Sequence, residues 1–133
     1  NLLVIMLANR PERFLDLTDT ESVEPIVDYH LMRGCIRTGC VDILDPELRA
    51  RMEARRWVDV LEEDAIRSAC ATAIRVLVRS SGQSVAQVDG FFFVNGRSVC
   101  LETEPARCDQ CPVAEACAQR AELFQPIFRT TAY

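Results

Sequence analysis

The sequence predicts an all-α protein, and three observations support this fold class. Apolar residues recur at three- and four-residue spacing along several segments, which is the period of a helix with one buried face. These segments begin beside aspartate or serine residues that favour helix N-caps, and they end at glycines that favour a C-cap. Residues 91–94 could alternatively form a strand, but the sequence offers them no partner strand.

The first clearly bounded helix is predicted from Tyr29 to Thr38. Asp28 stands before it as a natural N-cap, and Gly39 follows it as the stop. Upstream, the apolar residues 1–8 are expected to form the end of a buried helix or strand. The apolar stripe of the 29–38 helix consists of Leu31, Met32, Cys35 and Ile36.

Three further helices are predicted downstream. Asp45 caps a helix over residues 46–56, whose first position is a proline. A longer helix spans residues 63–79 and is ended by Gly82, and the last spans residues 84–98. The residues expected in the core are Ile66, Ala69, Cys70, Ala73, Ile74, Leu77 and Val78 of the longer helix, Trp57, and the aromatic run 91–93.

The composition excludes several kinds of chemistry. The chain has 133 residues, which suits one compact domain, and all 15 of its basic residues are arginines. A mechanism that needs a lysine Schiff base is therefore excluded within the chain. Because His30 is the single histidine, a multi-histidine metal site is excluded too. The net charge of -5 argues against broad attraction to nucleic acid, although residues 49–56 form a local basic cluster.

The sequence contains neither a membrane span nor a signal peptide. Its longest apolar runs, residues 2–8 and 90–94, are too short to cross a bilayer, and no charged segment and cleavage site flank them. We therefore expect a cytoplasmic protein. The first residue is asparagine rather than methionine, and we expect a preceding segment or a partner chain to complete the fold.

The seven cysteines are unevenly distributed. Cys35, Cys40 and Cys70 are scattered through apolar, helix-like surroundings, and we expect them to act as small buried hydrophobic residues. An odd number with uneven spacing does not fit a secreted disulfide scaffold, so the expected compartment is reducing.

The other four cysteines form the strongest motif of the chain. Cys100, Cys108, Cys111 and Cys117 follow the pattern C-x7-C-x2-C-x5-C, so four thiolates can bind one metal centre. The candidates are a [4Fe–4S] cluster and a structural zinc ion. Zinc ribbons usually carry two C-x2-C pairs, and only one occurs here. The unequal arms favour the [4Fe–4S] cluster, in which each sulfur reaches a different iron.

Two segments resemble a known family. Residues 100–117 are similar to the iron–sulfur cluster loop that ends endonuclease III and the related adenine glycosylases, and residues 92–100 resemble the helix that leads into that loop. The sequence V-D-Y-H-L-M-R-G-C-I-R-T at residues 27–38 is similar to the family segment V-D-T-H-x-x-R-x-x-x-R-T, which carries the catalytic aspartate. Together the resemblance covers residues 27–120.

The resemblance implies a fold, a cofactor and an activity. The fold would be the helical bundle of the helix–hairpin–helix DNA glycosylases, with a helical region at residues 1–99, a cluster loop at 100–117 and a tail at 118–133. The [4Fe–4S] cluster would be structural, and the partner would be DNA. The chain would release a base by hydrolysing an N-glycosidic bond, without lyase activity because it has no lysine.

The resemblance also implies site residues. Asp28 takes the position of the catalytic carboxylate, and the backbone N–H groups at a helix N-terminus favour its ionised form. Such an anion can stabilise a cationic sugar or activate water beside a flipped nucleoside, whereas the structural alternative is a plain helix cap. Substrate contacts are expected from His30, Arg33, Arg37 and Arg107.

These substrate contacts have structural alternatives of their own. His30 could be a hydrogen-bonded histidine on the helix surface. Arg33 and Arg37 lie four residues apart on one helical face, where they could contact phosphate or pair with Asp28 or Glu24.

The sequence also departs from the family pattern. No glycine precedes Gly34, so the glycine-rich hairpin that binds DNA phosphate is absent or replaced. The loop between the first two cysteines is one residue longer, and in it Arg107 faces two glutamates. The charges of this loop and the absence of lysine argue against strong DNA binding. The alternatives are a non-catalytic iron–sulfur module that binds nucleic acid or protein, and a zinc-stabilised interaction domain.

Overall fold

The protein is built from helices, as the sequence predicts. The computed structural model describes residues 2–8, 10–12, 18–19 and 22–128, and these contain no strand. None of the helices in this described part has the length and apolar character needed to cross a bilayer. The helices are α1 (Leu2–Ala8), α2 (Tyr29–Thr38), α3 (Pro46–Glu53), α4 (Val60–Ser81) and α5 (Val85–Ser98), followed by the 3-10 turn η1 (Cys108–Gln110).

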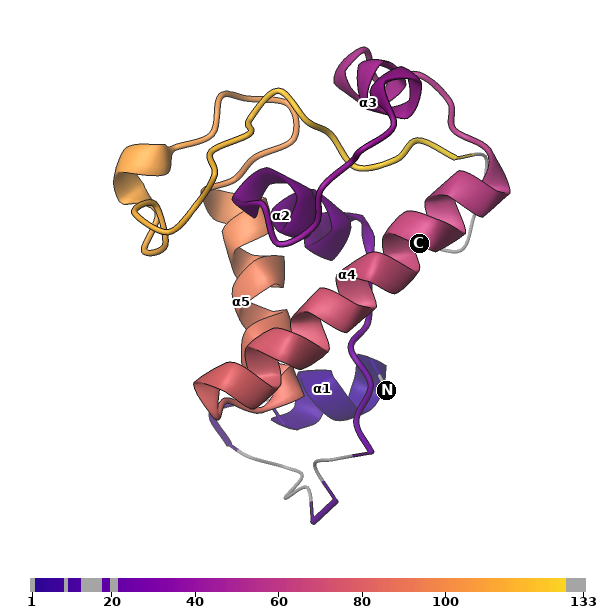
Figure 1. Ribbon diagram of the computed structural model, residues 1–133. Helices are drawn as coiled ribbons and strands as arrows, with labels where there is room; N and C mark the ends of the chain where they lie inside the picture. The colour runs from indigo at the N-terminus through magenta and orange to yellow at the C-terminus, as the bar shows by residue number, and fades with distance from the viewer. Residues whose placement is uncertain (1, 9, 13–17, 20–21, 129–133) are drawn as a thin grey trace.

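Helix α2 lies at the centre of the arrangement. It packs against α4 and α5, which also pack against each other, and α1 packs against α5. Figure 1 shows α4 as the long helix that crosses the molecule, with the C-terminal segment passing above α2 in this view toward α3. An isolated parallel β-bridge joins Trp57 to Ile127 and fixes the end of that segment beside the start of α4.

The ends of α2 lie where the sequence places them. The side chain of Asp28 accepts the backbone N–H of Leu31, which is the hydrogen bond of an N-cap. At the other end, Gly39 has φ +83°, a left-handed conformation that glycine adopts without strain. The helix is therefore held to Tyr29–Thr38 by local signals at both ends.

Two helix boundaries differ from the prediction by three residues each, and α4 also ends at Ser81 rather than residue 79, while α5 begins at Val85 rather than residue 84. Helix α4 begins at Val60 rather than residue 63, because Asp59 caps it and forms a capping box with Glu62. Helix α3 ends at Glu53 rather than residue 56, since Arg55 takes a left-handed φ of 52° that breaks the helix. The earlier start makes α4 almost one turn longer, and two of the added residues, Val60 and Leu61, are exposed.

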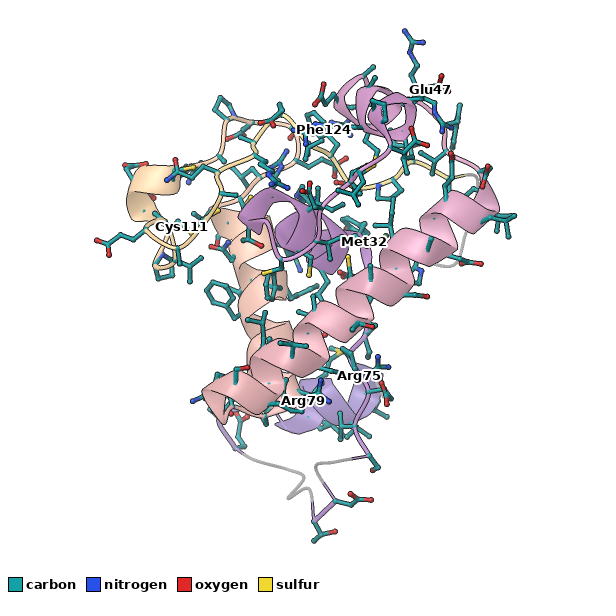
Figure 2. All side chains as sticks on the ribbon, viewed as in Figure 1. Met32, Glu47, Arg75, Arg79, Cys111 and Phe124 are labelled. Atoms are coloured by element: carbon teal, nitrogen blue, oxygen red, sulfur yellow. The ribbon has the colours of Figure 1, made fainter. Side chains whose placement is uncertain are left out.

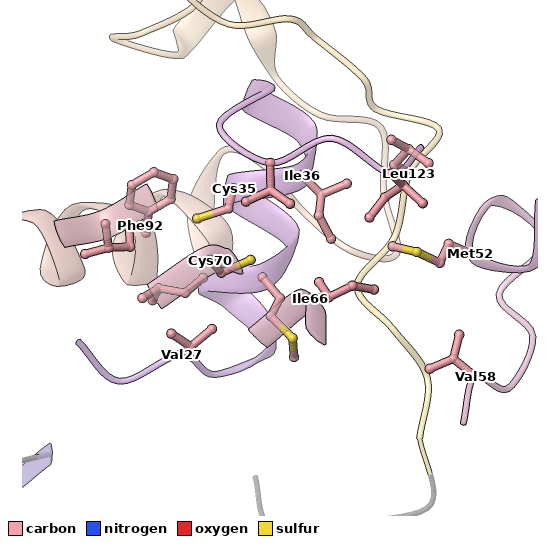
Figure 3. Packing of buried hydrophobic residues seen from close by; sticks show 14 residues of the cluster. Val27, Cys35, Ile36, Met52, Val58, Ile66, Cys70, Phe92 and Leu123 are labelled. Atoms are coloured by element: carbon pink, nitrogen blue, oxygen red, sulfur yellow. The ribbon is translucent and has the colours of Figure 1, made fainter. Parts of the chain in front are cut away.

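The core forms where α2 meets α4 and α5 (Figure 3). All four residues of the predicted α2 stripe are buried, together with Ile66, Cys70 and Ile74 of α4. Helices α2 and α5 approach closely at Gly34, where a Cβ atom would lie 2.4 Å from Cδ1 of Phe92. Gly34 is therefore needed for this crossing. Phe92 is the fully packed member of the aromatic run.

Several residues predicted in the core lie at the surface. Trp57 is 53% exposed, and its segment is joined to the C-terminal segment by backbone hydrogen bonding. Phe93 is 39% exposed, since the face of α5 that carries it turns toward His30 and not toward α4. Ala69 is exposed, and so are Leu3 and Met6 of α1, which packs against a single helix.

Candidate functional site

Asp28 lies where the chain turns into α2, and its side chain is half-buried. Its backbone is extended, and its Oδ1 accepts the N–H of Leu31 at 2.9 Å. The positive end of the helix dipole favours a negative charge at this position. Capping occupies Oδ1, so a catalytic role for the other carboxylate oxygen is compatible with it. The cap and the catalytic interpretation are not mutually exclusive.

A cavity of about 520 Å³ opens beside Asp28. Three parts of the chain line it: the first turn of α2, the second half of α5, and residues 101–103. It brings together three residues that were predicted as site residues and three that were not. The former are Asp28, His30 and Arg33, and the latter are Phe93, Arg97 and Glu102.

His30 is buried, so it is not the surface histidine of the structural alternative. Its Nδ1 lies 3.0 Å from Nη2 of Arg33. Because a guanidinium can only donate, Nδ1 is the acceptor and the neutral ring carries its proton on Nε2. Burial lowers the pKa of His30, and the charges of Arg33 and Arg97 lower it further against the opposing effect of Asp28. At neutral pH the ring is therefore an uncharged N–H donor.

Arg33 is the most deeply placed cation of the site, with 1% of its surface exposed. Its guanidinium makes four hydrogen bonds and, in addition, a 3.7 Å ion pair with Glu102. This arrangement replaces the expected pairing with Asp28 or Glu24. The other partners are the carbonyl of Cys100 (3.2 Å), Oε1 of Gln125 (3.2 Å), the carbonyl of Gly96 (2.7 Å) and Nδ1 of His30.

Arg37 is buried as well and faces the cysteine loop. Its Nε donates to the carbonyl of Leu123 at 2.6 Å, and its Nη1 to the carbonyl of Leu101 at 2.7 Å. The guanidinium also lies 5.1 Å from the ring centre of Phe124. It forms neither of the expected pairs, because Glu24 pairs with Arg75 instead. Both arginines of the motif thus bind the chain's own carbonyls rather than facing outward.

The exposed cation of the Asp28 cavity is Arg97. Its guanidinium lies 5.2 Å from the ring centre of Phe93, and among the described residues it takes part in no ion pair. Arg107 is exposed beside the cysteine loop, where it pairs with Glu104 at 3.4 Å. The sequence carried a signal for Arg97, since it follows Phe93 by four positions on the same helical face.

The four cysteines of the motif line a second cavity of about 30 Å³. All four are partly buried: Cys100 follows α5, Cys108 begins η1, and Cys111 and Cys117 lie in the turns after it. Asn95 of α5 and Arg37 of α2 complete the wall. Figure 2 shows Cys111 at the left of the molecule, in the turn after η1.

Helix α2 holds both ends of the cysteine loop. At the start, Arg33 binds the carbonyl of Cys100. At the end, the N–H of Ala118 donates to the carbonyl of Thr38 at 3.0 Å, and the N–H of Arg120 to that of Arg37 at 3.1 Å. Both ends of the cysteine loop are therefore hydrogen-bonded to the last two turns of α2.

Two sulfur atoms accept N–H groups. Nη1 of Arg37 lies 3.5 Å from Sγ of Cys100, and the backbone N–H of Gln119 donates to Sγ of Cys117 at 3.2 Å. Burial raises the pKa of Cys117 above its ordinary value, and the other three cysteines raise it further. The other three sulfur atoms are therefore near enough for their charges to raise the pKa of Cys117.

The donor set suits a metal centre in kind and number. Four thiols on one cavity, with N–H donors to two of them, are what a [4Fe–4S] cluster or a tetrahedral zinc ion requires. Within the described ranges, no three or more histidine, cysteine or carboxylate side chains are already arranged around a single metal position. The cysteines share a cavity, and their role as ligands stays a prediction.

Two of the remaining three cysteines are buried as predicted, and the third is not. Cys35 and Cys70 are fully buried in the core, as expected, and the hydrogen bond to Cys70 together with burial raises the pKa of Cys35. Cys40 is exposed, which corrects the expectation. It follows Gly39, which ends α2 in a left-handed conformation, and its Sγ lies 3.3 Å from Oγ1 of Thr38.

No family model, curated protein or solved structure matches the chain. The likeness to the glycosylases therefore rests on residues 27–38 and 92–117. Function has to be argued from the Asp28 cavity and the cysteine loop.

Proposed function

We propose that the chain is an iron–sulfur protein of the helix–hairpin–helix DNA glycosylase type, which releases a base by hydrolysing its N-glycosidic bond. One observation carries the proposal. Asp28 and His30 share a cavity large enough for a small-molecule-sized ligand such as a nucleoside, and Arg33 bonds both to His30 and to the first residue of the cysteine loop. The carboxylate and the four thiols of the two sequence motifs thus belong to one connected structure.

Asp28 acts on the sugar in this proposal. The bond between C1′ and the base breaks with its electron pair leaving on the base, so positive charge develops on the sugar. The ionised carboxylate stabilises that charge and then accepts a proton from the water that adds to C1′. His30, with its proton on Nε2, offers a hydrogen bond to the departing base from the same cavity wall.

The cysteine centre has a structural role in this proposal. Cys100, Cys108, Cys111 and Cys117 would hold a [4Fe–4S] cluster, which would cross-link the loop and take no part in bond cleavage. The N–H groups of Arg37 and Gln119 would stabilise the charge on two of the thiolates.

A second function is favoured by the pairing of the arginines. Arg33 and Arg37 use their donors inside the protein, and six exposed or partly exposed arginines pair with carboxylates, which reduces the number of cations available to DNA phosphates. A non-catalytic module that binds nucleic acid or protein, held together by a cluster or by zinc, fits this distribution of charge. The paired arginines are Arg49, Arg51, Arg55, Arg75, Arg107 and Arg120.

The decisive experiment replaces Asp28 and uses a matched cap as its control. Asp28→Asn should lower base release from mismatched or damaged oligonucleotides by about a thousandfold or more, because the carboxylate charge is lost. Asp45→Asn changes the cap of α3 in the same way and should leave the rate unchanged. Equal rates for Asp28→Asn and the wild type would refute the catalytic role. DNA binding without any base release by the wild type would favour the binding module.

The metal is identified by elemental analysis of the purified protein. A brown protein that contains iron and acid-labile sulfide in equal amounts is expected for the [4Fe–4S] cluster. A colourless protein with stoichiometric zinc would show that the centre is a zinc site.

A further inference from the structure

The segment that leads into α2 is held by side chains from two other helices. Asp89 of α5 is buried, and its Oδ1 accepts the backbone N–H of Ile26 at 3.2 Å. Arg67 of α4 donates to the carbonyl of Val27. The N–H of Asp28 itself donates to the carbonyl of Ile26 at 3.0 Å. Each of the last two residues before Asp28 is therefore bonded to a helix that lies far from it in the sequence.

These contacts matter because no helical ladder holds this part of the backbone. Residues 23–28 lie outside α2, so the direction in which Asp28 enters the helix depends on contacts from outside the segment. Arg67 is itself fixed by an ion pair with the buried Glu63, one turn earlier on α4. Asp89 thus holds a backbone N–H of this segment, and Arg67 holds a backbone carbonyl of it.

A third contact of the same segment is of a different kind. Arg75 of α4 pairs with Glu24, with Nε 3.0 Å from Oε2, and both side chains are largely exposed. This pair lies four residues before Asp28 and involves no backbone group of the segment. It provides a matched control for the two backbone contacts.

We infer that Asp89 and Arg67 are positioning residues for Asp28, acting through the backbone of Ile26 and Val27 and touching no substrate themselves. The catalytic part of this inference rests on the proposed function. A shift of about 1 Å in a reacting group can reduce a rate about a hundredfold, so the placement of this carboxylate has kinetic consequences. The two residues lie outside both sequence motifs, on α4 and α5.

Amide hydrogen exchange tests the positioning without any assay of activity. The N–H of Ile26 reports its bond to Asp89, and the N–H of Leu31 reports the bond to Oδ1 of Asp28. In Asp89→Leu, which has no acceptor, both amides should exchange about tenfold faster. In Asp89→Asn, which keeps an acceptor oxygen, both should exchange close to the wild-type rate.

Arg67→Met and Arg75→Gln complete the series of variants. Arg67→Met should also accelerate exchange at Leu31, because the carbonyl of Val27 loses its donor, while Arg75→Gln should not. This pair keeps the inference testable if Asp89→Leu does not fold. Unchanged exchange at Leu31 in Arg67→Met, or an equal effect of Arg75→Gln, would overturn it.

Single-turnover base release then tests the kinetic part. At saturating oligonucleotide, Arg67→Met should lower the rate constant about tenfold or more while the half-saturating concentration stays the same. A residue with a merely structural role would reduce the melting temperature and the active fraction but not this rate constant. If the wild type releases no base, the proposed function fails, and the exchange results still decide whether the two residues position Asp28.

Discussion

Nη1 of Arg37 lies 3.5 Å from Sγ of Cys100, although the two residues are 63 positions apart. The same guanidinium holds the carbonyls of Leu101 and Leu123, so one side chain of α2 joins the start of the cysteine loop to the C-terminal segment. Figure 2 shows Phe124 above α2 in this region. The last turns of α2 thus support the cysteine loop.

Replacing Arg37 should destabilise the protein strongly. Arg37→Met leaves two carbonyls without their donor, and we expect the free energy of unfolding to fall by about 3 kcal/mol. Chemical denaturation measures this loss. The control is Arg49→Met, which breaks half-exposed ion pairs and should cost no more than about 1 kcal/mol. Equal losses would mean that the carbonyl contacts of Arg37 contribute little.

Substitution of single cysteines should separate ligands from bystanders. Serine at any one of the four motif positions should remove most of the bound metal, because serine is a poor ligand for a soft metal centre. Cys40→Ser is the matched control, since Cys40 is an exposed thiol near the loop. Iron, sulfide and zinc contents of each variant are the measurement. Full metal content after the loss of a motif cysteine would remove that residue from the ligand set. The motif positions are Cys100, Cys108, Cys111 and Cys117.

Asp89 should make stability depend on pH. Burial, followed by the charge of Asp28, raises the pKa of Asp89 from 3.8 to about 6, against the effect of its bond to Ile26. The folded state therefore keeps a proton that the unfolded state loses, and stability falls as pH rises through this range.

Comparison with Asp89→Asn isolates this dependence from that of other groups. Between about pH 4 and about pH 7, the variant should gain up to about 3 kcal/mol of stability relative to the wild type. Denaturation series at several pH values provide the difference. A difference that stays constant with pH would mean that the carboxyl group titrates normally in the folded protein.

The crossing of α2 and α5 should not tolerate a methyl group at position 34. The added Cβ of Gly34→Ala would overlap the ring of Phe92, so we expect a loss of about 1–3 kcal/mol. The double variant with Phe92→Leu should recover part of this loss, because the ring atom that causes the overlap is removed. A double-mutant cycle measures the coupling. Additive losses would contradict a direct contact between the two positions.

Arg97 should contribute to nucleic-acid binding if the Asp28 cavity faces DNA. Removing one phosphate contact by Arg97→Gln should weaken binding and reduce the slope of log K against log salt by about one. Arg79→Gln is the matched control, since Arg79 is also exposed but lies at the opposite end of the molecule from Phe124 (Figure 2). Titration of a labelled duplex at several salt concentrations gives both slopes. Identical slopes would remove Arg97 from the interface.

The features predicted best from the sequence are those encoded by neighbouring residues. The cap at Asp28, the proline at the start of α3 and the stop at Gly39 each depend on a few adjacent positions, and all three are confirmed. The buried stripe of α2 follows from the same local periodicity. The boundary of α4 was missed because Asp59 and Glu62 form a capping box before the apolar pattern begins.

The surroundings of the site could not be predicted in this way. The burial of Arg33 depends on carbonyl and amide oxygens that lie 63 to 92 positions away in the sequence. No local sequence pattern indicates these partners. Trp57 and Phe93 are apolar, but the partners that would cover them are determined by how α5 and the C-terminal segment pack. Asp89 was missed for a related reason, since its hydrogen-bond partner Ile26 lies 63 positions away in the sequence.

Because α2 binds the cysteine loop at both ends, hydrogen bonds to the helical body help to close the loop. The entropy of bringing its ends together is already offset by hydrogen bonds of the helical body. The four thiols consequently remain at a high effective concentration around one cavity. If these thiols hold a metal, as proposed, loss of that metal should leave both ends of the loop bound to α2.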